Sequence, residues 1–198
     1  MNPLQSFTVS LIINLKERRI KKMSKLIQGF IVVTALLLFV ATVAVQAEEG
    51  TVKAMAPWQG QGKAYVTGPE KMLFVGEFNG IMYVETGEGT LDAALILCPA
   101  TQEINIKGMT SRAHGNCIIS PAKGDIIFAE WKCSGKPGGC NGTLTLTDGT
   151  GRFKGISGSG EMVVRTALMG LAKNLKSGDV VKAAAGLAVW PKLKYKIP

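Results

Sequence analysis

Alternation of apolar and polar side chains runs through the middle of this chain and predicts a succession of β-strands. In "EINIK" (103–107), the two isoleucines point one way and the three polar side chains point the other way. "TLTLT" (143–147) repeats this pattern. Three further runs are rich in β-forming residues: "KMLFVGEFNGIMYVE" (71–85), "GDIIFAEWKC" (124–133) and "GEMVVRT" (160–166). Between the runs lie the turn clusters "TGPE", "TGEGT", "CPATQ", "SPAKGD" and "TDGTG". Short strands between such turns predict an all-β sandwich or barrel.

The last part of the chain, residues 167–198, follows a different pattern. Three leucines lie on one face of a short predicted helix, at Leu168, Leu171 and Leu175. A final alternating run follows, in which Leu187, Val189, Pro191, Leu193, Tyr195 and Ile197 share one face, opposite Trp190, Lys192, Lys194 and Lys196. Outward lysines are typical of an edge strand that must not pair with a neighbour, and an edge also tolerates proline. We therefore expect a short helix and a lysine-edged final strand packed on a β-domain that covers residues 48–166.

The N-terminal part has the layout of a secretory signal peptide. Six Lys/Arg residues precede an uncharged segment that runs from Leu26 to Ala47, and an acidic pair follows it. Val45 and Ala47 offer small side chains to a signal peptidase, so residues 1–47 are predicted to be removed. Met23 is a possible alternative start. The 22 uncharged residues also reach the length of about 20 that spans a bilayer, so a retained membrane anchor is the competing interpretation.

Charge is concentrated at the two ends of the chain. The formal net charge is +9, but residues 48–166 hold eleven basic and twelve acidic side chains. A nucleic-acid-binding surface needs basic residues clustered on the folded body, so we expect no nucleic-acid partner. A transmembrane barrel is also rejected, because the predicted strands are mostly shorter than the ~9–11 residues that it requires and only 7% of residues are aromatic.

Four cysteines in an exported chain predict a disulfide framework. Cys133 and Cys140 stand at the two ends of the Gly/Pro loop "CSGKPGGC", which leaves Cys98 to pair with Cys117. The Cys98–Cys117 pairing has a geometric difficulty, because a simple hairpin that "EINIK" forms with its neighbours places the two sulfurs at opposite ends of the sheet. A zinc site is disfavoured, since the chain has no C-x-x-C motif and a single histidine, His114. We expect no metal and no cofactor.

The glycine-rich stretch "DGTGRFKGISGSGEM" (148–162) invites a phosphate-binding interpretation, which its spacing excludes. A dinucleotide fingerprint would need glycine at the position of Lys154, and no P-loop motif occurs in the chain. The glycines are better explained as turn residues with positive φ. Phe153 is then predicted to plug the interior between two turns.

A resemblance to a known family rests on this stretch. "CNGTLTLTDGTGRFKGISGSGEM" resembles the late strands of the allene oxide cyclase and dirigent group of small β-barrels, in which a turn of the type matched by Gly149 to Gly155 joins two strands. The segments "CPA", "GNC", "WKCSG" and "CNG" are similar to those of exported bacterial relatives. The resemblance covers Trp58 to Thr166 and implies about eight antiparallel strands around a core or a small cavity. The polar groups that the plant proteins place inside the barrel cannot be matched here.

Catalytic chemistry has little support in the sequence. His114 lies in the turn-like stretch "SRAHGN" and is expected at the surface, away from any nucleophile. Four glutamates on predicted strands are expected to face solvent: Glu77, Glu85, Glu130 and Glu161. The leading hypothesis is an exported binding or structural barrel of the cell envelope or exterior, with a small apolar ligand as its possible partner. The alternatives are a cyclase- or isomerase-like enzyme that uses the cavity, and a membrane-anchored interaction module.

Overall fold

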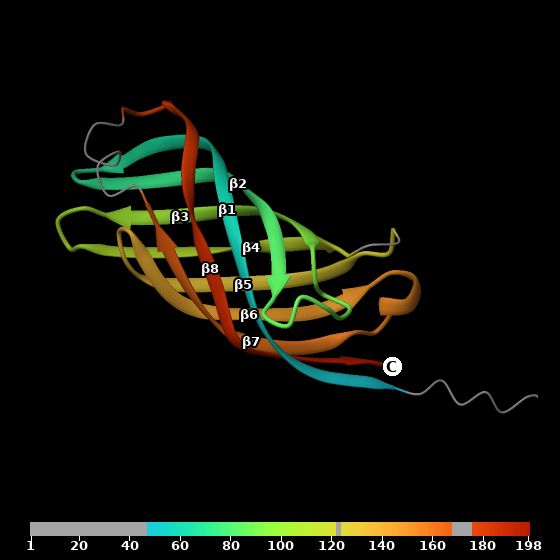
Figure 1. The fold of residues 1–198 in the computed structure, drawn as a ribbon. Coiled ribbons are helices and arrows are strands. Elements are labelled where there is room, and N and C mark those ends of the chain that lie inside the picture. The colour runs from blue at the N-terminus through green and yellow to red at the C-terminus, as the bar shows by residue number, and fades with distance from the viewer. Residues whose placement is uncertain (1–46, 122–123, 168–175) are drawn as a thin grey trace, which may run out of the picture. The chain divides into compact units, whose positions relative to one another are not determined.

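The structure is a computed structural model that describes residues 47–121, 124–167 and 176–198. Eight antiparallel strands form a closed barrel in which each strand pairs with the next along the chain (Figure 1). The strands are β1 (Glu48–Gly68), β2 (Lys71–Val84), β3 (Ala94–Asn105), β4 (Thr110–Ser120), β5 (Ile127–Lys136), β6 (Gly139–Gly149), β7 (Ser157–Thr166) and β8 (Val180–Ile197). The predicted all-β barrel of about eight strands is confirmed. The predicted helix at 168–175 and the predicted signal segment up to residue 46 lie outside the described residues.

Two segments that were predicted to be turns are strand. "CPATQ" lies within β3, and "SRAHGN" lies within β4. The turn between these strands is instead at residues 106–109. The strands are also longer than predicted, from 10 residues in β5 to 21 in β1. Length therefore gives no argument against a membrane barrel, and that part of the prediction was wrong. No helix within the described ranges is long and apolar enough to cross a membrane.

The final strand is not an edge strand, which corrects the sequence prediction. β8 pairs with β7 on one side and with β1 on the other, and thereby closes the barrel. The barrel consequently includes residues 180–197 and does not end at residue 166. Lys192, Lys194 and Lys196 are exposed as predicted, but they face solvent from a strand that is paired on both sides.

A β-bulge in β8 changes which side chains face the interior. Val52 pairs with Leu193, whereas Ala54 pairs with Trp190, so β8 contains one more residue than β1 between these two pairs. An extra residue in one strand shifts the alternation of its side chains. Trp190 and Leu193 are both buried as a result. The prediction that Trp190 shares the outer face with the lysines was wrong for this reason.

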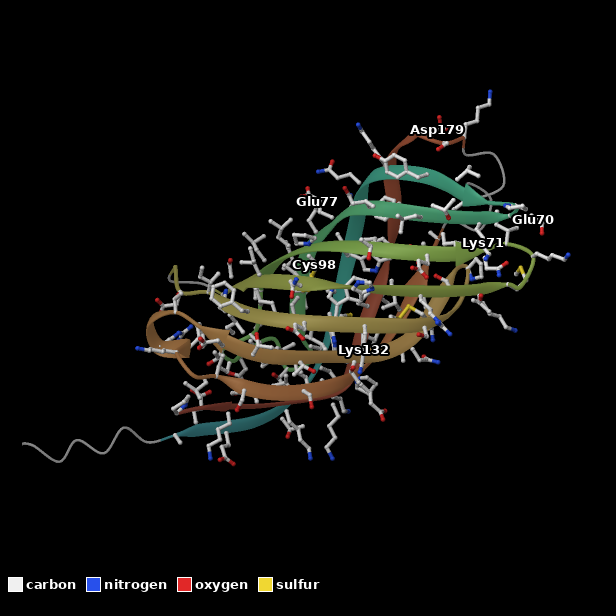
Figure 2. All side chains as sticks on the ribbon, turned by 180° about the vertical axis from the view of Figure 1, so that it is seen from behind. Glu70, Lys71, Glu77, Cys98, Lys132 and Asp179 are labelled. Carbon is white, nitrogen blue, oxygen red and sulfur yellow. A yellow bond between two sulfur atoms is a disulfide. The ribbon has the colours of Figure 1, made fainter. Side chains whose placement is uncertain are left out.

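The interior of the barrel is apolar and is closed at one end. Leu91, Phe153 and Ile156 are almost fully buried there, in the connections that follow β2 and β6. Charged side chains lie on the outside, among them Lys71 and Lys132, which Figure 2 labels. The turns after β1, β3 and β5 form the opposite end (Figure 1).

Candidate binding cavity

The barrel interior holds a half-open cavity of about 80 Å³ with an almost wholly apolar wall. Its lining comes from the inner faces of the strands and includes Ala56, Trp58, Phe78, Ile96, Cys98, Gln102, Ala113, Cys117, Ile119, Trp131, Cys140, Leu144, Met162, Val164, Thr166, Ala188 and Trp190. Alanines from three strands leave space that larger side chains would fill. An apolar hollow with few polar groups is typical of a small-molecule binding site.

Aromatic rings form one continuous part of the wall. The ring centroids of Trp58 and Phe78 are 5.2 Å apart, and those of Phe78 and Trp131 are 5.8 Å apart. Both pairs meet edge to face, which is a favourable arrangement for aromatic rings. Trp190 adds the third tryptophan, so all three tryptophans of the chain line the cavity.

Two of these tryptophans carry hydrogen-bond donors without a partner. The indole nitrogens of Trp131 and Trp190 are buried, and neither forms a hydrogen bond. Trp190 as a whole is only 4% exposed. A buried donor left unpaired costs about 1–3 kcal/mol, and native proteins contain few of them. The sequence analysis placed Trp190 on the outer face because it assumed unbroken alternation along the final strand. Pro191 was the available signal for a bulge, since proline within a strand often marks one.

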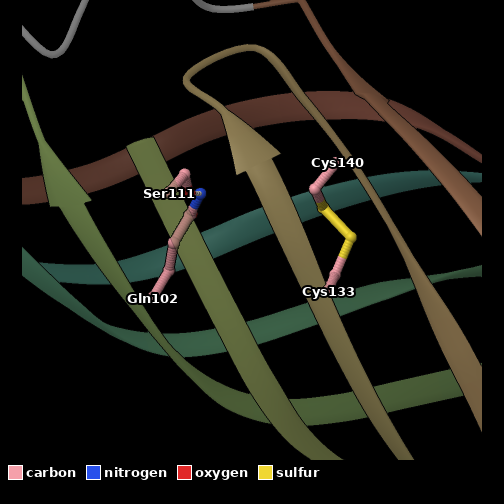
Figure 3. The surroundings of a disulfide bond; sticks show 4 residues. All are labelled: Gln102, Ser111, Cys133 and Cys140. Atoms are coloured by element: carbon pink, nitrogen blue, oxygen red, sulfur yellow. Dashed lines mark hydrogen bonds between the residues drawn. A yellow bond between two sulfur atoms is a disulfide. The ribbon is translucent and has the colours of Figure 1, made fainter. Parts of the chain in front are cut away.

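Polar groups are few at the cavity wall. The Gln102 side chain lines the cavity, and its Nε2 donates to the hydroxyl of buried Ser111 at 2.8 Å. Figure 3 shows these two side chains together with the Cys133–Cys140 disulfide. This pair fixes one amide in the wall, where Asn79, Thr166 and the tryptophans add the other polar groups.

Both predicted disulfides are present. Cys98 bonds to Cys117, and Cys133 bonds to Cys140, so the chain has no free cysteine. The geometric difficulty that the sequence analysis raised for the Cys98–Cys117 bond does not arise. Leu97 pairs with Ile118 and Ala100 pairs with Gly115, which places Cys98 opposite Cys117 at a Cα separation of 4.1 Å. The two cysteines are equally far from the turn at 106–109, because that turn, rather than "CPATQ", ends β3.

The second disulfide crosses the β5–β6 hairpin diagonally. Cys133 lies opposite Gly142, and the Cα atoms of Cys133 and Cys140 are 5.6 Å apart. A side chain at Gly142 would collide with the backbone of Lys132 and Cys133. Glycine there lets the two strands approach closely beside the disulfide.

The glycine-rich stretch is a strand connection that closes one end of the barrel. Phe153 is fully buried in a short 3-10 turn between β6 and β7, as predicted. Gly151 has φ of 52° and lies against the Asp125 carboxylate, where a side chain would not fit.

Asp148 lies at the start of this connection, and its Oδ1 accepts hydrogen bonds from the backbone N–H groups of Gly155 and Gly149, both at 2.8 Å. These two bonds hold the pKa of the Asp148 carboxyl below its usual value.

The residues considered for catalysis lie on the outside of the barrel. Glu85, Glu130 and Glu161 are exposed, and Glu77 is partly exposed and accepts a hydrogen bond from Gln61. His114 is also exposed, and its Nε2 lies 3.4 Å from Oγ1 of Thr101. It lies within β4 rather than in the predicted turn. No carboxylate or histidine lines the cavity among the described residues, and none of their His, Cys, Asp and Glu side chains gather into a metal-binding group.

Comparisons with known proteins give no relative. No protein family, curated protein or solved structure matches this chain. The resemblance to the allene oxide cyclase and dirigent group therefore remains a prediction from the sequence.

Proposed function

We propose that this protein is an exported β-barrel that binds a small, largely apolar molecule in its interior. The observation that carries the proposal is the apolar cavity of about 80 Å³ that all three tryptophans line. The volume is about half that of an engineered apolar cavity of about 150 Å³ that accepts benzene, and because this cavity is half open, a small ring or a short chain can extend toward its mouth. Export is supported by the predicted signal segment and by the two disulfides, which form and persist in oxidising compartments.

This proposal is compatible with membership of the exported barrels related to the allene oxide cyclase and dirigent group. The proposed function does not include the catalytic chemistry of that group. An enzyme that uses the cavity would need an acid, a base or another reactive group directed inward. Among the described residues, the polar members of the lining are Asn79, Gln102, Thr166 and the three tryptophans. These groups can orient a ligand.

Tryptophan fluorescence tests the proposal directly, because every tryptophan lies at the cavity. Titration with cyclopentane, a small apolar ring, is expected to change the emission in a saturable way. The variants Ala113→Leu and Ala188→Leu place extra carbon atoms in the cavity from β4 and β8. Either variant should abolish the response while the protein stays folded, because the added side chain occupies the binding space.

The matched control is Thr145→Leu, which adds a leucine to an exposed position of β6. This variant should bind cyclopentane like the wild-type protein. Two results would contradict the proposal: no saturable response in the wild-type protein, or an undiminished response in both cavity-filling variants.

A further inference from the structure

We infer that the ligand of this cavity carries a neutral hydrogen-bond acceptor of the carbonyl type, and that Trp131 and Trp190 donate their indole N–H groups to it. The inference rests on the proposed binding function and specifies the chemical class of the ligand. Both tryptophans line the cavity, from β5 and β8 respectively, and both indole nitrogens lack a partner.

The two N–H groups call for an explanation because no other buried side-chain nitrogen or oxygen among the described residues lacks a hydrogen-bond partner. Ser111, the one buried polar side chain besides the tryptophans in the part of the chain that the structure describes, has its partner in Gln102. Each of the two indole nitrogens has almost no accessible surface and no hydrogen-bond partner within the protein. Phenylalanine would fill much of the same space without an unpaired donor. A ligand acceptor would give these donors a role, and the proposal requires each ring to turn so that its N–H reaches the cavity.

The absence of charge from the wall determines that the acceptor is neutral. No lysine or arginine lines the cavity among the residues that the structure describes. A carboxylate placed there would lose its hydration without gaining a counter-ion, which is strongly unfavourable. A ketone, aldehyde or ester oxygen has two lone pairs and pays a much smaller desolvation penalty. Such an oxygen can accept from one indole N–H or from both.

The test compares cyclopentane with cyclopentanone, two rings that differ only by the carbonyl oxygen. Affinities of both compounds are measured for the wild-type protein, Trp190→Phe, Trp131→Phe and the control Trp58→Phe. The indole nitrogen of Trp58 is not one of the two unpaired buried nitrogens, although its ring lines the same cavity. For each protein, the affinity for cyclopentanone is divided by the affinity for cyclopentane. Because the hydration free energies of the two free compounds are the same in every experiment, they cancel when this ratio is compared between proteins.

We expect Trp190→Phe and Trp131→Phe each to lower this ratio by about fivefold, which corresponds to the loss of one neutral hydrogen bond. Trp58→Phe should weaken both compounds equally and leave the ratio unchanged. In the ¹⁵N–¹H spectrum of the wild-type protein, cyclopentanone should move the Trp131 and Trp190 indole protons downfield of their positions with cyclopentane. Each of the three Trp→Phe variants lacks one indole signal, and this loss assigns the signals of Trp58, Trp131 and Trp190.

The outcomes separate this inference from the function on which it rests. Binding of both compounds with unchanged ratios in all variants and no downfield shift would overturn the inference and leave the binding function standing. Failure of both compounds to bind would overturn both. If a tryptophan variant fails to fold, the indole shifts of the wild-type protein still decide the question.

Discussion

At the scale of single residues, Phe153 shows how one aromatic ring closes the barrel. Its side chain is fully buried in the core, and the Arg152 guanidinium lies 4.5 Å from its ring centroid. The surrounding turn is held by the backbone hydrogen bonds to Asp148 and by the Thr150 hydroxyl, which accepts from the Ile126 N–H at 3.0 Å. The glycines allow the backbone to form this turn, and the phenylalanine fills the space beneath it.

Truncation of Phe153 should therefore destabilise the whole barrel. Phe153→Ala is expected to lower the free energy of unfolding by about 3–5 kcal/mol, because it removes a buried ring and leaves a cavity. Chemical denaturation measures this change. Arg152→Ala is the control, since Arg152 is exposed and contributes at most a surface cation–π contact of about 0.5–1 kcal/mol. A near-neutral effect of Phe153→Ala would contradict the assignment of this ring to the core.

Asp148 should make the stability of the barrel depend on pH in the acid range. The pKa of its carboxyl is lowered in the folded state, chiefly by the N–H of Gly155 and then by that of Gly149. The ionised form thus favours folding above the unfolded pKa of about 3.9, and this contribution is lost as the pH falls through the lower folded pKa. Unfolding measured from pH 6 to pH 2 should show a smaller acid-induced loss for Asp148→Asn than for the wild-type protein. Equal losses would show that these hydrogen bonds do not favour the ionised carboxyl.

At the scale of elements, the two disulfides each tie a hairpin on the inner side of the barrel. The Cys98–Cys117 bond joins β3 to β4 opposite one another, and the Cys133–Cys140 bond joins β5 to β6 across their turn. Cys98, Cys117 and Cys140 also line the cavity. The disulfides therefore constrain the strands that form one side of the binding space.

Loss of either disulfide should be measurable as a loss of stability. In the chain-entropy model, the Cys133–Cys140 loop contributes about 2–3 kcal/mol, and the longer Cys98–Cys117 loop contributes about 3 kcal/mol. The paired variants Cys133→Ser/Cys140→Ser and Cys98→Ser/Cys117→Ser are compared by thermal unfolding. Peptide mapping of the non-reduced wild-type protein checks the pairing, and a Cys117–Cys133 peptide would contradict it.

At the scale of the whole molecule, the barrel is a closed wall with an apolar interior and a charged exterior. In the described part of the chain, closure by β8 gives every strand a neighbour on both sides, which removes the long open edges that favour pairing with another chain. The two disulfides indicate an oxidising, extracellular-type environment. β1 begins at Glu48, whose carboxylate accepts a hydrogen bond from the Tyr195 hydroxyl at 3.0 Å.

The exported protein is expected to start at Glu48, because small side chains at Val45 and Ala47 suit a signal peptidase. N-terminal sequencing and the intact mass of protein collected after export test this. Ala47→Arg should block cleavage, since a large charged side chain replaces the small one next to the cleavage point. A mass that retains residues 26–47 in the wild-type protein would favour the membrane anchor instead.

The sequence by itself determined the class of the fold, the disulfide pairs and the role of Phe153. Alternation, turn residues and the spacing of cysteines are local signals, and these features depend on neighbouring residues within a hairpin or a turn. The first half of β4 was predicted to be a turn because "SRAHGN" is polar and lacks apolar alternation; its pairing with β3 and β5 compensates for this weak local preference.

Only the tertiary structure decided how the barrel closes and what its interior contains. β8 pairs with β1, more than a hundred residues earlier in the chain, and no local pattern records a pairing over that distance. The bulge beside Pro191 then turns Trp190 inward, because one extra residue shifts the alternation of the strand. The cavity and its two unpaired indole N–H groups follow from this register. They exist only where strands that are distant in sequence face one another across the barrel.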